Sequence, residues 1–222
     1  MIDYTVFVIN ISDKRWAKYQ SDKRYTRFKG CNGKEDLDMD WINERHHFRY
    51  NAKDDHKFNV VGCSQSHRGC MKHIQEYKIN NAIVIEDDAL IDFNRLSELD
   101  DIKEFCYIGG WMRGPVLTKQ KEWIKPIFNK GVHKIDTAKF VVSNCHGYYF
   151  PSWRDTIYML EDRVCSHQNH PKRRAIDVEF CHKQRAYDLQ FIYPAISTLH
   201  LSDANEGFTY SKYVLKDNMY HY

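Results

Sequence analysis

The sequence has 222 residues, of which 28% are charged and 42% are hydrophobic, and its formal net charge is +3. These values are typical of a globular protein and exclude a disordered chain, while the small net charge does not favour nucleic acid as a partner. No apolar run reaches the roughly 20 residues of a transmembrane segment, and no secretory signal begins the chain. The seven cysteines lack paired spacing, as expected for reduced thiols. We therefore expect a cytoplasmic protein.

The first half of the chain alternates between predicted strands and helices. Residues 5–9 are predicted to form a buried strand, and a helix is expected to begin at Lys14. Residues 58–61 resemble a short strand that leads into a helix over about 66–78, and residues 82–86 form the next predicted strand. Two strands joined by a crossover helix are expected to be parallel. The pattern predicts an α/β fold with a Rossmann-like sheet flanked by helices.

The second half is less regular, and we interpret it as part of the same single domain, 1–203, followed by a tyrosine-rich tail of that domain, 204–222. The polar segment 30–57 is expected to be a surface excursion with one short helix at 41–48. The further predicted elements are a strand at 105–108, a hairpin at 132–142, helices at 152–160 and 176–187, and strands at 190–193 and 197–201.

Three consecutive carboxylates, Glu86, Asp87 and Asp88, follow the predicted strand at 82–86. In an open α/β sheet, ligands bind outside the carboxyl ends of the strands. Because side chains alternate along an extended chain, Glu86 and Asp88 share a face and could flank one Mg²⁺ or Mn²⁺ ion, while Asp87 points elsewhere. The alternative is a solvated acidic turn without a ligand.

Three segments resemble, in order and spacing, glycosyltransferase family 25, which includes lipopolysaccharide-modifying and collagen galactosyltransferases. These segments are Val8-Ile9-Asn10 with Lys14-Arg15, Gly62 to His67, and Ile83 to Asp88. Two further segments, 147–152 and 176–179, add to the resemblance, which covers roughly residues 4–200. The compact length also resembles small glycosyltransferase domains of large algal viruses, which would act in the host cytoplasm. Segments 30–57 and 111–135 have no counterpart, so the donor sugar and the acceptor stay open.

The resemblance implies a GT-A type fold and a metal-dependent hexosyltransferase. Its donor would be a nucleoside diphosphate sugar, with a UDP-sugar favoured, and its acceptor a hydroxyl of a glycan or glycoprotein. The acidic run matches the Asp-x-Asp motif of such enzymes, with Asp88 as the direct metal ligand and Glu86 reaching the metal or the ribose. His200 would be the second metal ligand, with Asp203 as the alternative, and an imidazole ligand favours Mn²⁺ over Mg²⁺.

Donor contacts are assigned to Asn10, Arg15, Ser66, Arg68, Glu86 and Asp87. Asn10 and Arg15 flank the turn after the first strand, where nucleotides bind in α/β sheets. Ser66 and Arg68 are expected near the start of a helix, whose N-terminus favours an anion. The alternatives are a solvated surface arginine at position 15 and a simple N-cap at Ser66.

An inverting transfer needs a carboxylate that removes the proton of the acceptor hydroxyl. Asp177 is the first candidate for this base because it begins a predicted helix in the later acidic segment, and Glu179 is the second. Either carboxylate could instead compensate the N-terminus of that helix. A retaining enzyme would need no such base, and the sequence leaves the stereochemistry open.

Two other classes of protein compete with the transferase. A metal-dependent phosphoesterase or nuclease would use the same carboxylates to activate water, but it needs a second cluster of ligands near Asp88. A non-catalytic module that binds nucleotide sugars is the other alternative. A zinc site through Cys63-x3-His67 lacks a matching second pair at the spacing of structural zinc sites.

Overall fold

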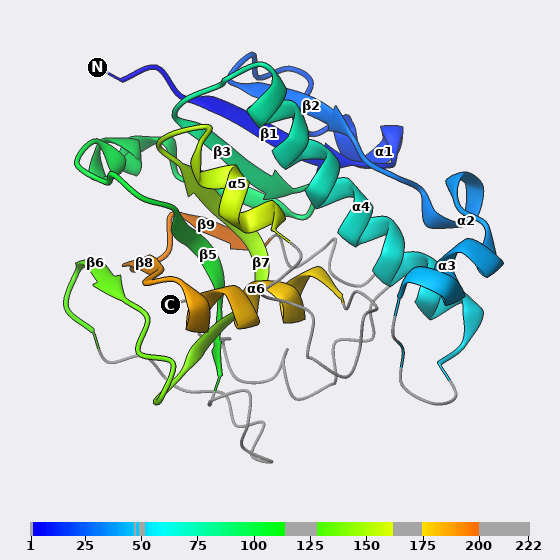
Figure 1. The fold of residues 1–222 in the computed structure, drawn as a ribbon. Coiled ribbons are helices and arrows are strands. Elements are labelled where there is room, and N and C mark those ends of the chain that lie inside the picture. Colours follow the sequence, from blue (N-terminus) through cyan, green and yellow to red (C-terminus); the bar gives the residue numbers. More distant parts are fainter. Residues whose placement is uncertain (1, 47, 49–51, 114–127, 162–174, 200–222) are drawn as a thin grey trace, which may run out of the picture.

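The computed structural model describes residues 2–46, 48, 52–113, 128–161 and 175–199. Within these residues, seven strands form one mixed sheet in the order β2-β1-β3-β7-β5-β8-β6 (Figure 1). The strands are β1 (Thr5–Asn10), β2 (Tyr25–Lys29), β3 (Ala82–Glu86), β5 (Cys106–Arg113), β6 (Gly131–Lys134), β7 (Val141–Phe150) and β8 (Gln190–Tyr193). A separate two-stranded ribbon pairs β4 (Ala89–Ile91) with β9 (Ser197–Leu199). The mixed sheet flanked by helices confirms the predicted Rossmann-like α/β fold.

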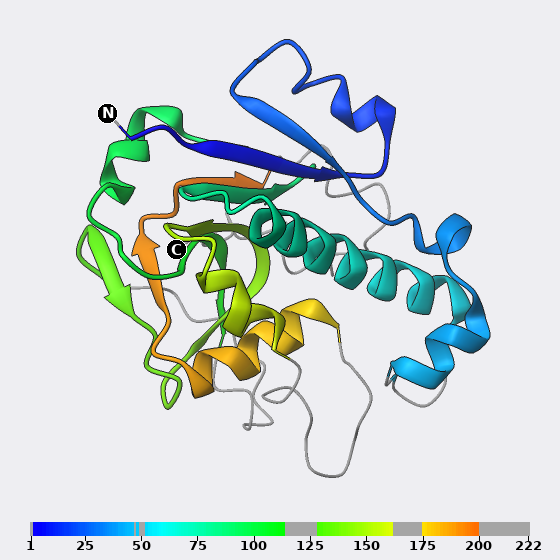
Figure 2. The same cartoon turned by 45° about the horizontal axis from the view of Figure 1, so that its top comes forward.

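Both faces of the sheet are covered (Figures 1 and 2). Helices α4 (Asp54–Glu76), α5 (Asp155–Leu160) and α6 (Ile176–Ala186) cover one face, where Phe7 and Val84 share a hydrophobic cluster with Met71. On the other face, Val6 and its neighbours pack with Leu99 at the end of the 3-10 helix η1 (Phe93–Leu99). The period-2 alternation of β1 and β3 therefore serves two cores, and this explains why both strands consist almost entirely of apolar residues.

The order of the strands in the sheet reverses at β1, because β2 lies on one side of it and β3 on the other. Strand β1 pairs with both in parallel. The short helix α1 (Asp13–Trp16) lies in the connection from β1 to β2, and α4 in the connection from β2 to β3. The carboxyl ends of β1 and β3 lie side by side, with Ile9 in register with Glu86. This is the place where open α/β sheets bind ligands.

The predicted strand at 58–61 is wrong, because these residues belong to α4, which already begins at Asp54. Ser66 and Arg68 consequently lie in the middle of this helix rather than near its start. Tertiary packing overrides the local β-branched pattern. Helix α2 (Gly33–Asp36) crosses α4 so closely that a Cβ on Gly62 would lie 2.8 Å from the backbone nitrogen of Gly33.

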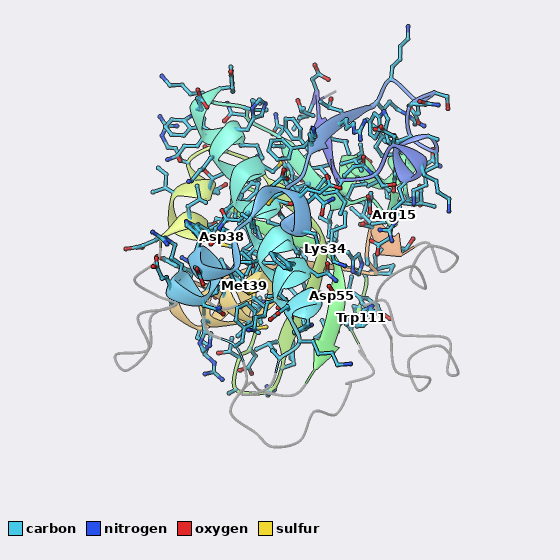
Figure 3. All side chains as sticks on the ribbon, turned by 90° about the vertical axis from the view of Figure 1, so that its right-hand side faces the viewer. Arg15, Lys34, Asp38, Met39, Asp55 and Trp111 are labelled. Carbon is cyan, nitrogen blue, oxygen red and sulfur yellow. The ribbon has the colours of Figure 1, made fainter. Side chains whose placement is uncertain are left out.

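The two short helices described within the 30–57 excursion pack against α4, as Figure 3 shows. Lys34 of α2 forms a 3.0 Å ion pair with Asp55, and Asp38 caps the next helix, α3 (Met39–Arg45), by accepting bonds from the backbone of Asp40 and Trp41. The expected short helix in this excursion is thus present, although it begins and ends slightly earlier than predicted.

The predicted hairpin at 132–142 is also wrong. Strand β6 pairs with β8, whereas β7 runs through the middle of the sheet and pairs antiparallel with β3 and β5. The expected helices correspond to α5 and α6, and the expected late strands to β8 and β9. No helix among the described residues is long and apolar enough to cross a membrane. The expected tail, 204–222, lies outside the described residues.

Candidate active site

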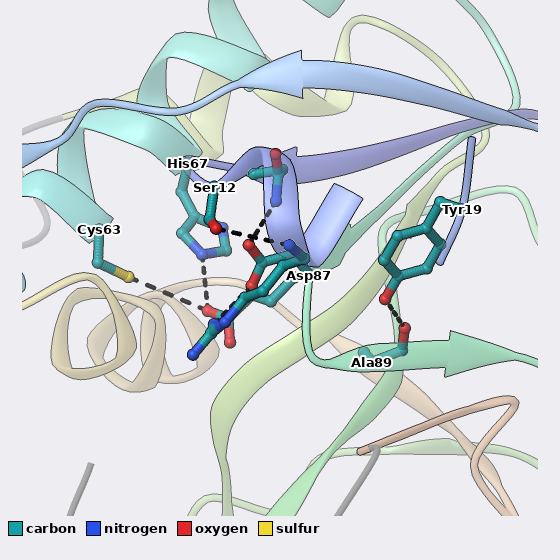
Figure 4. Close-up of polar contacts among 9 residues, drawn as sticks. Ser12, Tyr19, Cys63, His67, Asp87 and Ala89 are labelled. Carbon is teal, nitrogen blue, oxygen red and sulfur yellow. Dashed lines mark hydrogen bonds and ion pairs between the residues drawn. The ribbon is translucent and has the colours of Figure 1, made fainter. Parts of the chain in front are cut away.

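Asp87 is held by two side chains from the segment that follows β1. Nδ2 of Asn10 donates to Oδ2 of Asp87 over 2.7 Å, and Nη1 of Arg15 donates to Oδ1 over 2.8 Å (Figure 4). Ser12 caps the helix that carries Arg15 by accepting from its backbone N–H at 3.5 Å. Asp87 is buried, so this charge-assisted pairing is needed to offset the loss of its hydration.

Glu86 points toward helix α4. Its Oε1 lies 3.0 Å from Nε2 of His67 and 4.0 Å from Sγ of Cys63 (Figure 4). On the other side of the His67 ring, Nδ1 lies 2.8 Å from the hydroxyl of Tyr148. Burial raises the pKa of Glu86, but the bond with His67 and the positive charges of His67, His146 and Arg15 outweigh burial and lower that pKa overall. Glu86 is therefore an anion fixed in orientation from the interior.

Asp88 differs from its two neighbours because its Oδ1 is buried and has no hydrogen-bond partner among the described residues. Burial, together with the negative charges of Glu86 and Asp87, raises the pKa of Asp88 to about 7 against the opposing charges of Arg15 and Lys18. The next residue is fixed, since the hydroxyl of Tyr19 donates to the carbonyl of Ala89 over 2.5 Å. A divalent cation would stabilise an uncompensated carboxylate at a strand end. Asp88 therefore has the properties of a metal ligand.

Asp177 belongs to the same acidic region. It is the second residue of α6, where no side chain caps the helix, and it is only partly buried. Burial and the negative charges of Glu86, Asp177 and Asp88 together raise the pKa of the Cys63 thiol well above its usual value. Asp177, Glu86 and Asp88 therefore all lie within electrostatic range of Cys63, although Asp177 is on a helix that begins 88 residues after Asp88 along the chain.

Three other predicted site residues are buried and bonded to protein groups. Ser66 donates to the carbonyl of Gly62 over 2.7 Å and accepts from the backbone of Cys31 over 2.8 Å. Nη2 of Arg68 lies 2.8 Å from Oε2 of Glu179, and the two side chains are 5% and 2% exposed. Arg68 and Glu179 therefore neutralise each other between α4 and α6.

The two late candidates, His200 and Asp203, lie outside the described residues. The strand before them, β9, pairs antiparallel with β4, and its last residue, Leu199, is in register with Ala89. Ala89 directly follows Asp88, so the end of β9 lies beside the acidic run.

Sequence reasoning missed Cys63 and His67, which contact Glu86, and Tyr148, which bonds to His67. The signal for the first two was their i, i+4 spacing, which places both on one face once the helix is known to extend through them. Tyr148 had no comparable signal because it contacts His67 across the sheet, 81 residues away.

Comparison with known protein families matches residues 4–150 to the model described as glycosyltransferase family 25 (LPS biosynthesis protein). The match contains β1, α4, β3 and β7, which carry Asn10, His67, the acidic run and Tyr148. The chain belongs to glycosyltransferase family 25. No curated protein matches the chain in the corresponding search.

Membership of glycosyltransferase family 25 confirms the resemblance found in the sequence and supports glycosyltransferase activity, with a sugar donor and an acceptor. The matched part ends at the close of β7, so it does not include Asp177, Glu179 or His200. The roles of these three residues, like those of the candidate site residues inside the matched part, stay predictions.

Replacement of Arg68 by Met should lower the free energy of unfolding by about 3–5 kcal/mol, because it leaves the buried charge of Glu179 without its partner. The double variant Arg68→Met/Glu179→Met should be less destabilised than the sum of the two single variants. Urea denaturation of all four proteins measures this coupling. Arg45→Met is a matched control, since Arg45 pairs with Glu44 at the surface and should change stability by less than about 1 kcal/mol. Additive single effects would contradict the proposed coupling.

Asp88 should make the metal-free protein less stable as the pH rises. Its pKa is about 7 in the folded protein, against an ordinary value of 3.8 in the unfolded chain, so between these values the folded state holds a proton that the unfolded state has lost. From pH 5 to pH 8, the wild type should lose on the order of 2 kcal/mol of unfolding free energy relative to Asp88→Asn.

Urea denaturation in EDTA across this pH range measures the difference. Asp101→Asn, which removes an exposed carboxylate, is the control and should follow the wild type. If the pH profiles of the wild type and Asp88→Asn run parallel, Asp88 is not the uncompensated carboxylate.

Proposed function

We propose that this chain is a metal-dependent GT-A type hexosyltransferase. It transfers a hexose from a nucleoside diphosphate sugar, with UDP as the favoured nucleotide, to a hydroxyl of a glycan or glycoprotein, with inversion at the anomeric carbon. The observation that carries the proposal is the buried Oδ1 of Asp88, which has no hydrogen-bond partner in the described part of the chain and lies just after β3, in a member of glycosyltransferase family 25.

Asp88 is the proposed direct ligand of a divalent cation, with Glu86 beside it on the open side of the strand end. His200, which directly follows Leu199, is the proposed second ligand because Leu199 is in register with Ala89. A carboxylate and imidazole set favours Mn²⁺. When bound, the ion neutralises charge that develops on the departing diphosphate.

Arg15 and Asn10 are proposed to position the donor at the crevice between β1 and β3. The side chain of Arg15 is 25% exposed while it pairs with Asp87, so a phosphate oxygen could approach this side chain from the solvent side. In this proposal Asp87 does not touch the donor. It orients the side chain of Arg15 through their ion pair. Ser66 and Arg68, predicted as donor contacts, are given no direct contact in this proposal because their partners are within the core.

Asp177 is the proposed base. It is partly buried at the first turn of α6 and lies near the acidic run, whereas Glu179 is neutralised by Arg68. In this role the carboxylate of Asp177 accepts the proton of the acceptor hydroxyl as its oxygen attacks the anomeric carbon from the face opposite the diphosphate. The cytoplasmic location expected from composition is supported by five described cysteines that are free thiols.

Nucleotide binding should depend on Mn²⁺ and on Asp88. Calorimetry with UDP, UDP-glucose, UDP-galactose, GDP and dTDP, each with Mn²⁺ and with EDTA, should give tight binding of one nucleotide only with the metal. Asp88→Asn should weaken that binding at least about tenfold and lower turnover by 100-fold or more, whereas the control Asp101→Asn should leave both unchanged. Binding that is equal in EDTA would exclude the metal site, and a protein that binds none of these nucleotides but hydrolyses phosphodiesters would be the rival phosphoesterase.

Asp177→Asn should lower kcat by roughly 100- to 10,000-fold while the Kd of the donor stays within about twofold, since a base acts in the chemical step. The matched comparison is Glu179→Gln, whose effect should appear mainly in stability. Proton NMR of the product determines the anomeric configuration. A product with retained configuration would remove the need for a base and with it this role of Asp177.

A further inference from the structure

Cys63, His67 and Glu86 form a compact set of three different ligand atoms. Sγ of Cys63, Nε2 of His67 and a carboxylate oxygen of Glu86 all lie within 4.8 Å of one another. Cys63 and His67 are four residues apart on α4, so they share a face of the helix, and Glu86 faces them from the end of β3 (Figure 4). Sulfur, imidazole nitrogen and carboxylate oxygen are together the ligand types of zinc sites.

The spacing of these atoms is close to that of a tetrahedral zinc site. Zn–S bonds of about 2.3 Å and Zn–N or Zn–O bonds of about 2.0–2.1 Å separate a sulfur from an oxygen by roughly 3.5 Å and a nitrogen from an oxygen by roughly 3.3 Å. The observed separations from Oε1 of Glu86 are 4.0 Å to the sulfur and 3.0 Å to the nitrogen. These two separations differ from the tetrahedral values by about 0.5 Å and 0.3 Å, and the sulfur lies within 4.8 Å of the nitrogen.

The residues around this set also favour a cation with one open position. His67 is 1% exposed and is held from behind by the hydroxyl of Tyr148, 2.8 Å from its Nδ1, which directs Nε2 toward Glu86. An outer hydrogen bond of this kind fixes the ring orientation of metal-binding histidines. Glu86 is 33% exposed, so a fourth ligand such as water can approach from the solvent side.

We propose that Cys63, His67 and Glu86 form a binding site for a thiophilic divalent cation, with Zn²⁺ as the expected ion. Thiolate and imidazole ligands favour Zn²⁺ over Mg²⁺ and Mn²⁺, so this site is distinct in selectivity from the oxygen-rich site proposed at Asp88. On binding, the thiol of Cys63 releases its proton to solvent, and the imidazole keeps a proton on Nδ1 that it donates to the hydroxyl of Tyr148. The two anionic ligands then neutralise the ion, and no oxidation or reduction occurs.

The inference does not depend on the proposed transferase reaction, but it has a consequence for that reaction. Glu86 belongs to both ligand sets, so an ion bound to Cys63 and His67 draws its carboxylate toward α4 and away from the donor. Micromolar Zn²⁺ is therefore expected to inhibit a Mn²⁺-activated enzyme, and Cys63→Ser should reduce this inhibition.

The test uses Co²⁺ as a spectroscopic substitute for Zn²⁺ in the full chain. Thiolate ligation of Co²⁺ should produce a near-ultraviolet charge-transfer band that Zn²⁺ abolishes by competition. Cys63→Ser and Cys63→Ala should lose the band and bind Zn²⁺ at least tenfold more weakly, measured by competition with a chromophoric chelator. Tyr148→Phe should keep the band and weaken Zn²⁺ binding about 10- to 100-fold.

Two controls separate this site from other ligands. Cys31→Ser removes a partly buried cysteine outside the set and should keep the band, and Asp88→Asn should keep it as well. If Asp88→Asn loses Mn²⁺-dependent nucleotide binding but keeps the band, the donor site has been damaged while the site at Cys63, His67 and Glu86 is intact, which supports two separate sites. A wild-type protein without a thiolate band, or a band that persists in both Cys63 variants, would overturn the proposal.

Discussion

The structure depends on how three adjacent carboxylates are accommodated at the end of one buried strand. Like charges at this spacing repel each other, and partial burial strengthens the repulsion because solvent screens them less. The three carboxylates of the run differ in their hydrogen-bond partners. Asp87 is paired with Asn10 and Arg15, and Glu86 is bonded to His67. Asp88 has no such partner for its buried Oδ1 among the described residues. The elements around β3 supply partners for the first two carboxylates, and the proposed cation would supply the partner for the third.

The sequence was sufficient for the fold where local pattern and tertiary environment agree. Strands β1 and β3 were predicted because both their faces are buried, which requires continuous apolar runs. The prediction failed at 58–61, where β-branched residues suggested a strand. There, contact between the backbones at Gly33 and Gly62 permits α2 to cross α4, and packing over the length of α4 outweighs local propensity. Strand β2 was missed because it lies at the edge of the sheet, none of its five residues is buried, and its sequence mixes aromatic with polar and charged residues without a period-2 apolar pattern.

The candidate site was predictable to the extent that its residues are contiguous. The acidic run and the turn after β1 could be located because strand ends in an α/β sheet have a known relation to ligands. The pairing of Arg68 with Glu179 joins residues 111 positions apart, and no spacing rule connects them. The same holds for Tyr148 and His67. Arg68, predicted as a donor contact, and Glu179, predicted as the second candidate base, thus proved to be partners of each other. A single sequence does not reveal such a pairing.

Glu86 links the chemistry of the proposed donor site to the interior of the protein. Its carboxylate is accessible to solvent on one side and is bonded to the buried His67 on the other. The position of this carboxylate therefore depends on α4 as well as on what binds in the crevice. A group bonded in this way cannot serve a hard cation beside Asp88 and a soft cation beside Cys63 with equal strength, because each would pull the same carboxylate in a different direction. If both proposed sites bind their ions, the identity of the bound cation would decide where Glu86 lies, and metal selectivity and donor binding would be coupled through this one side chain.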